Sequence, residues 1–201
     1  NLGTENLITQ QKPELLERVF NGEVVFVPPI RSDVNVTVGK NSEHKPLTMF
    51  FAAPIRDSKG TVIAVLTQRL LPEGELSKIL QAGRIGQSGE SYIINQEGAM
   101  VTESRFKEQL YDIGRMNEGE KLDVRDPGGN MVDGFRTNRP RSDLPYTRMA
   151  EELLHMANVK EKRLHSKIIV DVKGYRDYRG VPVMGAWFWD HHLKLGMTTE
   201  I

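Results

Sequence analysis

The chain has 201 residues, of which 38% are hydrophobic and 27% charged, and its 27 basic residues balance its 27 acidic residues. This is the composition of a globular protein that can bury a core, in one large domain or two small ones. The balanced charge excludes the basic footprint of a nucleic-acid-binding protein. No apolar run in the sequence approaches the roughly 18 residues of a membrane-spanning helix, and the lack of cysteine says little about the compartment.

The first part of the chain predicts a helix, a short strand, a hairpin and a second helix. Residues 1–10 show no helical periodicity, whereas apolar residues recur at helical spacing between Pro13 and Gly22. A strand at 24–27 is expected to end at Pro28-Pro29, because proline donates no hydrogen bond to a sheet. The further expected elements are a polar loop at 31–46 with a short strand at 34–38, strands at 47–53 and 61–69 around the turn 57–60, and a helix over 76–80 that stops at Gly83.

A second series of elements follows residue 83. The expected ones are hairpin strands at 91–95 and 99–102, a helix over 144–157 and three closing strands from residue 168. Val183, Trp187 and Trp189 would lie on one face of the middle closing strand. The residues at 184, 186 and 188 on its other face are apolar as well, so both faces must be covered, or one must line a cavity.

A short internal repeat divides the chain. Residues 56–60 and 176–180 share the pattern R-D-x-x-G, each between two expected strands, and the copies lie 120 residues apart (176 − 56). We interpret this spacing as a module length, which predicts two modules at residues 1–82 and 83–201. The counterpart of the hairpin at 91–102 would fall before residue 1, so the first module is expected to be incomplete at its N-terminus.

Patterns that carry catalysis are incomplete in this sequence. The segment GQSGE at 86–90 contains Ser88 but lacks the second glycine of a nucleophile elbow, and a helix precedes it instead of a strand. It also lacks the Gly-Lys-Ser/Thr ending of a phosphate-binding loop. His191 and His192 are neighbours that would point to opposite faces of an extended segment. We therefore expect no enzyme, no metal site and no cofactor, with a small hydrolase that uses Ser88 as the alternative.

Aromatic side chains gather in the second module, among them Tyr92, Tyr175 and Trp187. Such a set either fills a core or lines a pocket for a small ligand. Arg105 either belongs to a capped strand end with a salt bridge or reaches a ligand carboxylate. Asp177 either makes the turn of the repeat or orients a ligand through its charge.

Two long motifs then resemble a known family. Residues 86–98, GQSGESYIINQEG, resemble the G-x-x-G-x-x-Y-φ-φ-x-x-x-G opening of a Cache module, and ESRF follows at 103–106. Residues 175–201 resemble the closing segment of such a module, and residues 49–69 are similar to the last hairpin of a membrane-distal Cache module. The chain thus resembles a double Cache sensor domain over nearly its whole length.

This resemblance implies an α+β fold of two PAS-like modules in tandem, each with an antiparallel five-stranded sheet, and a long N-terminal helix that braces both. That helix and the distal opening hairpin are missing from these residues. The implied protein is a prokaryotic transmembrane receptor of the histidine kinase, chemoreceptor or diguanylate cyclase type. The chain would be its extracytoplasmic sensing part, forming a homodimer in the whole receptor, meeting the membrane only through segments outside these residues, and binding no nucleic acid.

The resemblance also implies a small-molecule ligand of the amino acid, amine or organic acid class. In the distal module Asp33 is the candidate for the acid that binds an amine, and Phe26 and Phe51 are the further candidates. Residues 14–23 depart from the aromatic–Arg–Trp pattern of amino-acid-binding members, because they contain no tryptophan. The proximal candidates are Tyr92, Arg105, Tyr175, Asp177 and Trp187. The alternative to ligand sensing is a ligand-free structural module that dimerises receptors.

Overall fold

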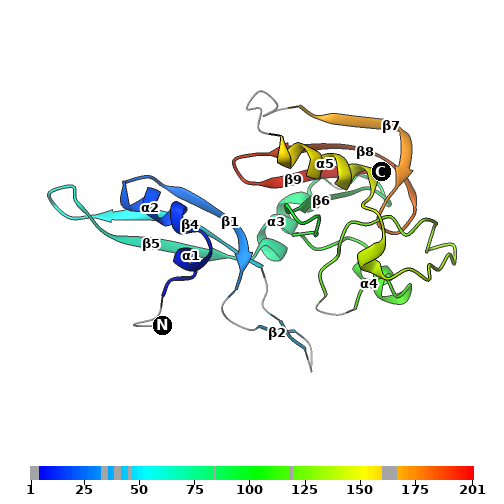
Figure 1. Ribbon diagram of the computed structural model, residues 1–201, viewed down its shortest axis with the longest axis horizontal. Helices are drawn as coiled ribbons and strands as arrows, with labels where there is room; N and C mark the ends of the chain where they lie inside the picture. Colours follow the sequence, from blue (N-terminus) through cyan, green and yellow to red (C-terminus); the bar gives the residue numbers. More distant parts are fainter. Residues whose placement is uncertain are drawn as a thin grey trace. The chain divides into compact units, whose positions relative to one another are not determined.

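The computed structural model describes residues 5–32, 36–38, 42–44, 47–83, 85–117, 120–159 and 167–201. The chain divides into two compact units, Asn1–Glu75 and Leu76–Ile201 (Figure 1). Every paired strand within the described residues runs antiparallel to its partner, and helices accompany the sheets in both units. The predicted α+β class is therefore confirmed. The division after residue 82 that the repeat indicates stays a prediction.

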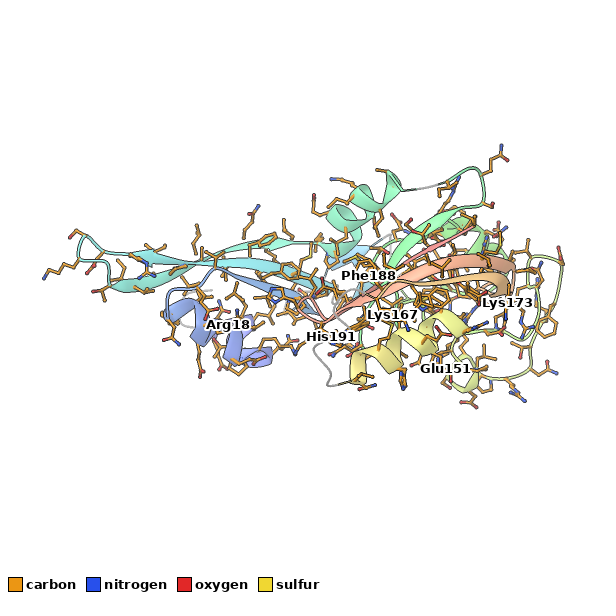
Figure 2. All side chains as sticks on the ribbon, turned by 90° about the horizontal axis from the view of Figure 1, so that it is seen from above. Arg18, Glu151, Lys167, Lys173, Phe188 and His191 are labelled. Atoms are coloured by element: carbon orange, nitrogen blue, oxygen red, sulfur yellow. The ribbon has the colours of Figure 1, made fainter. Side chains whose placement is uncertain are left out.

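The first unit is a three-stranded sheet with two helices on one side. Its elements are α1 (Leu7–Gln11), α2 (Pro13–Phe20), β1 (Val25–Arg31), β2 (Val36–Val38), β3 (Ser42–His44), β4 (Leu47–Arg56) and β5 (Val62–Leu70). The sheet has the order β1-β4-β5, and β2 pairs with β3 alone. Ile8, Val19, Val27 and Phe50 are buried where the helices meet the sheet. Figure 2 shows both helices below this sheet, with Arg18 on α2.

Two details of the first unit differ from the sequence-based expectations. Helix α1 was not expected, and it begins where the Asn6 side chain accepts a hydrogen bond from the amide of Ile8 at 2.8 Å, which caps the helix. Strand β1 does not end at Pro28-Pro29 but continues to Arg31, because a bulge between Val27 and Ile30 removes the prolines from the ladder. Proline is tolerated there since β1 is an edge strand.

The second unit contains a larger antiparallel sheet. Its elements are α3 (Pro72–Gln81, which crosses the division between the units), β6 (Glu90–Ile94), α4 (Lys107–Asp112), a 3-10 turn η1 (Arg141–Asp143), α5 (Arg148–Asn158), β7 (Ile169–Arg176), β8 (Pro182–Asp190) and β9 (Leu195–Glu200). The sheet order is β6-β9-β8-β7, and Met100 pairs with Ile94 through a further antiparallel bridge. The resemblance implied five strands, and the sheet has four within the described residues, with the expected strand at 99–102 present only as bridges. With the bridged segment counted as a strand, the order along the chain is 2-1-5-4-3, as in a PAS-like sheet.

Helix α5 packs on one face of the second sheet (Figures 1 and 2). It begins at Arg148 rather than at residue 144, because Pro145 disfavours a helical residue before it and Thr147 caps the helix through the amide of Ala150. Its buried Leu153 lies so close to β9 that a Cβ at Gly196 would come within 2.8 Å of a leucine methyl. Glu151 lies on the outer side of α5 in Figure 2.

The two faces of strand β8 differ in exposure. Val183, Trp187 and Trp189 are buried on the inner face, as the alternation predicted. On the outer face Met184 is 41% exposed, and Val172 of the adjacent β7 is 73% exposed. The expectation that both faces are covered therefore holds for the inner face only, within the residues that the structure describes. None of the described helices has the length and apolar character that a membrane crossing requires.

The internal repeat is the same hairpin turn built twice. The Asp57 carboxylate accepts hydrogen bonds from the amides of residues 59 and 61, both at 2.9 Å, between β4 and β5. The Asp177 carboxylate accepts from the amides of residues 179 and 181 at 2.8 and 2.9 Å, between β7 and β8. Gly60 and Gly180 close the turns in the left-handed region, at φ of 86° and 80°. The pattern R-D-x-x-G thus forms the same hairpin turn in both units.

Candidate ligand site in the second unit

A cluster of polar side chains lies on the inner face of the second sheet, among residues that are otherwise apolar. Glu90 of β6 and Glu200 of β9 are cross-strand partners, and each is only 3% exposed. Residues directly opposite each other in an antiparallel pair put their side chains on the same face of the sheet. The sheet therefore places two carboxyl groups side by side inside the unit.

Two tyrosines bind the carboxyl group of Glu200. The Tyr175 hydroxyl donates to one carboxyl oxygen at 2.7 Å, and the Tyr92 hydroxyl donates to the other at 2.9 Å. The Tyr175 side chain crosses directly over Gly185, where a Cβ would overlap the phenol oxygen. Glycine at this position of β8 is what allows the tyrosine from β7 to reach β9.

Glu90 accepts hydrogen bonds from the segment at 103–106 and from the turn at 176–180. It accepts a hydrogen bond from the amide of Arg105 at 2.6 Å and another from the Tyr178 hydroxyl. The Tyr178 hydroxyl also lies 2.8 Å from the hydroxyl of Ser104, which accepts from the amide of Phe106 at 2.9 Å. These contacts tie the strand end at 103–106 to the turn at 176–180.

Both carboxylate oxygens of Asp177 are bound by other groups of this chain. One oxygen accepts the two amide hydrogen bonds of the turn, and the other lies 2.7 and 2.8 Å from the guanidinium of Arg179. Both side chains are buried, and the guanidinium also lies 3.5 Å from the centre of the Phe106 ring and donates to Gln109 at 3.0 Å. Asp177 therefore makes the turn and holds an internal ion pair.

The guanidinium of Arg105 fastens the loop before β6. It donates to the carbonyl oxygen of Gly89 at 2.6 Å and to that of Gly86 at 3.1 and 3.2 Å. The neighbouring Glu103 and Lys107 form a salt bridge of 2.7 Å on the surface. The salt bridge matches one part of the capped-strand-end alternative, but Phe106 at the start of α4 (Lys107–Asp112) makes no side-chain cap bond. The Arg105 side chain holds the loop at 86–89.

Burial dominates the protonation of these carboxyl groups. The pKa of Glu200 is raised to about 8, first by burial and next by the charge of Asp177, while hydrogen bonds from Tyr175 and Tyr92 act in the opposite direction. Burial also raises the pKa of Glu90, against the hydrogen bond from Tyr178. The pKa of Asp177 is raised by burial as well, and its partner Arg179 counteracts that effect.

Trp187 lies next to the cluster and brings a polar atom into the core. It is 1% exposed, and its ring meets that of Tyr175 edge to face at 5.5 Å. Among the described residues its indole N–H meets no hydrogen-bond acceptor. A buried donor without an acceptor costs about 1–3 kcal/mol. Trp187 is thus both a core residue and the carrier of a donor that an oxygen atom could satisfy.

The predicted residues of the first unit do not join this cluster. Phe26 and Phe51 are cross-strand partners with ring centres 5.3 Å apart, and Phe51 is 47% exposed. They lie on the face of the sheet opposite Val27 and Phe50, which pack against the helices. Asp33 lies outside the described residues. The structure therefore brings Tyr92, Arg105, Tyr175, Asp177 and Trp187 together within the second unit, and the phenylalanine pair belongs to the first unit.

Sequence reasoning missed the acids at the centre of the cluster. Glu90 has the same strand parity as Tyr92 and Ile94, so an alternation count would have placed it inward. Glu200 shares its parity with Gly196 and Thr198, which carry no apolar signal, so the sequence contains no indication of its burial. Asp190, in the predicted Asp-His-His segment, caps the β8–β9 turn through the amides of residues 192 and 193. No group of three or more metal-ligating side chains occurs in the part of the chain that the structure describes.

Comparison with known proteins gives structural similarity without sequence similarity. No family model and no curated protein matches the sequence. Three similar solved structures are the extracellular domain of mmHK1S-Z3, named as a histidine kinase (TM-score 0.45, 11% identity), the periplasmic sensory domain of the Campylobacter jejuni chemoreceptor Tlp1 (0.46, 14%) and the extracellular domain of mmHK1S-Z2, also named as a histidine kinase (0.46, 8%).

These matches cover 100%, 96% and 98% of this chain but only 58%, 55% and 57% of the solved chains. The chain therefore spans little more than half the length of each. Scores and identities this low do not establish membership of a family.

Proposed function

We propose that this chain is part of an extracytoplasmic sensor of the double Cache type, which binds a small molecule and passes a conformational change to the rest of a transmembrane receptor. The observation that carries the proposal is the PAS-like strand order of the second sheet, with carboxyl and hydroxyl groups buried on its covered face. Ligand pockets use a few oriented polar groups within apolar surroundings. The motifs at 86–98 and 175–201 and the turn built twice support the same conclusion.

The sensor proposal concerns a binding unit and not an enzyme. The whole receptor would carry a histidine kinase, chemoreceptor or diguanylate cyclase output, and its ligand would be an amino acid, an amine or an organic acid. Such a ligand signals only if it binds two arrangements of the sensor with different affinity. In the second unit, Trp187 would donate its indole N–H to an oxygen of the ligand, beside Tyr175.

A thermal-shift screen of the chain against amino acids, amines and organic acids tests the proposal. A ligand at about 100 times its dissociation constant should stabilise the folded chain by roughly 2.7 kcal/mol through mass action. Trp187→Phe should abolish the shift, whereas Trp189→Phe, in an equally buried tryptophan of the same face, should retain it. A shift that instead disappears with Asp33→Asn would place the ligand in the first unit, and no shift with any compound would refute ligand sensing.

The second candidate is a ligand-free module that holds receptor chains together. The exposed apolar side chains on the outer face of the second sheet favour it, because contact between apolar surface and water is unfavourable and a partner that covers the face removes that contact. Light scattering of the purified chain measures whether it forms a dimer. A dimer that Val172→Asp dissociates, in a chain that no compound stabilises, would support this candidate over the sensor.

A further inference from the structure

The paired carboxyl groups of β6 and β9 have a consequence that does not depend on any ligand. Glu90 and Glu200 lie directly opposite each other on one face of the sheet, and both are buried. Two like charges in that position repel each other, and burial weakens the screening of that repulsion by water. The pair is most stable when it holds at least one proton.

The donors around the pair do not replace that proton with a positive charge. Within the described residues Glu200 accepts from two tyrosine hydroxyls, and Glu90 accepts from one tyrosine hydroxyl and one amide. The buried guanidinium of Arg179 is committed to Asp177. The other buried guanidinium, that of Arg115, donates to the carbonyl oxygens of residues 123, 125 and 178. Every described hydrogen-bond donor to the pair is therefore neutral.

The elements that surround the pair contribute more acid than base. The titratable groups that face it are Glu90 and Tyr92 from β6, Tyr175 from β7, Asp177, Tyr178 and Arg179 from the β7–β8 turn, and Glu200 from β9. Helix α5 presents apolar side chains to the sheet, and its Arg148 is paired with Asp171 at 2.7 Å and with Glu152. Three carboxyl groups thus share one guanidinium in this interior.

We propose that the Glu90–Glu200 pair is a proton-binding site, and that loss of its proton in mildly alkaline solution loosens β9 from β6. The proton leaves a carboxyl group for solvent, and the two carboxylates that remain repel each other across the strand pair. Because the groups interact, the pair titrates as a unit, and the proton is not assigned to one residue alone. The second unit would then respond to pH whether or not it binds a small molecule.

The direction of the pH effect follows from the raised pKa. Since the pKa of Glu200 rises from 4.5 to about 8 on folding, the folded chain binds more protons than the unfolded chain between these values. The stabilisation of the folded chain by the bound proton is complete below the pKa of Glu200 in the unfolded chain. It is lost as the pH rises through the pKa of Glu200 in the folded chain. Ordinary carboxylates have the opposite dependence, because their pKa falls on folding.

Urea unfolding of the full chain, followed by tryptophan fluorescence, tests the proposal because both tryptophans lie on β8 of this unit. We expect the urea midpoint of wild type to fall most steeply between about pH 5 and about pH 8 and to level off above about pH 8, because the folded chain binds more protons than the unfolded chain only between the two pKa values. Glu200→Gln, which mimics the protonated acid, should flatten that profile. Glu151→Gln, on the exposed outer side of α5, should leave the profile unchanged.

Parallel profiles for wild type and Glu200→Gln would overturn the proposal. If the glutamine variant does not fold, infrared spectra of wild type decide the matter through the carbonyl stretch of a protonated carboxyl group. That band should persist at neutral pH and disappear near pH 8, and its loss below about pH 6 would overturn the proposal. Tyr175→Phe removes a donor to the carboxylate, so it should shift the titration to higher pH, which a purely structural role would not do.

Discussion

Replacing the turn aspartate in each unit separates its local role from its role in the interior. Asp57 and Asp177 make the same pair of amide hydrogen bonds, and asparagine retains the oxygen that accepts them. Asp177 alone is buried and ion-paired with a buried arginine, since its second oxygen lies 2.7 Å from the guanidinium of Arg179. The difference between the losses of unfolding free energy in the two variants therefore measures the contribution of the buried Asp177–Arg179 ion pair.

The expected magnitudes differ by several fold. Asp57→Asn keeps the turn and changes a partly exposed charge, so it should cost no more than about 0.5 kcal/mol. Asp177→Asn leaves the guanidinium of Arg179 buried without its counter-ion, which typically costs about 3–5 kcal/mol. The contacts of Arg179 with the Phe106 ring and Gln109 remain in the variant, and they favour the lower end of that range.

Urea unfolding of the 201-residue chain at neutral pH provides the assay. Tryptophan fluorescence follows the second unit, and hydrogen exchange of the β4 and β5 amides follows the first. Asp177→Asn should lower the fluorescence midpoint and leave exchange in β4 and β5 unchanged, while Asp57→Asn should have little effect on either. Equal, small losses from both substitutions would refute the reasoning that the buried ion pair distinguishes the two turns.

The remaining predictions concern packing around the same sheets and use the same two measurements, tryptophan fluorescence for the second unit and hydrogen exchange for the first. Gly180→Ala should lower the free energy of unfolding clearly more than Gly60→Ala. Both glycines have a left-handed backbone, so Gly60→Ala should cost about 1 kcal/mol, but only at position 180 would the new methyl group also overlap the carbonyl oxygen of Gly129. Equal losses from the two substitutions would contradict this close approach. Leu153→Ala should cost about 2–5 kcal/mol because this side chain of α5 is fully buried against the sheet. Val172→Ala, on a residue 73% exposed, should stay within about 0.5 kcal/mol, and a larger loss would mean that the outer face is covered in solution.

Local patterns in the sequence predicted most of the elements. The β4–β5 hairpin, the closing three-strand meander and the helix that contains Leu153 follow from alternation, turn residues and helical spacing, all of which act over a few neighbouring residues. The expected strand at 99–102 is present only as isolated bridges of Ala99 and Met100. The repeat R-D-x-x-G correctly indicated one turn in two places. The exceptions are also local: a capped short helix before Pro13 and a bulge that carries β1 past two prolines.

The candidate site was predicted only in part. Tyr92, Tyr175 and Trp187 were expected together because aromatic residues cluster in the second half of the chain, and the structure places them in one core. Their hydrogen-bond partner was not expected, since Glu200 lies 108 positions from Tyr92 and reads in isolation as an ordinary strand-end acid. The ligand-binding role of these residues stays a prediction.

The sequence by itself determined the antiparallel α+β class, the twofold use of one turn and the inward face of β8, because each depends on the order of residues along a few turns or strands. Only the tertiary structure decided which acids are buried. Strand pairing brings Glu90 and Glu200 side by side on one face of the sheet, and the hydroxyl groups of Tyr175 and Tyr178 donate hydrogen bonds to them. A carboxyl group has an ordinary pKa until the chain folds around it, and the removal of water on folding is what raises the pKa of these two acids.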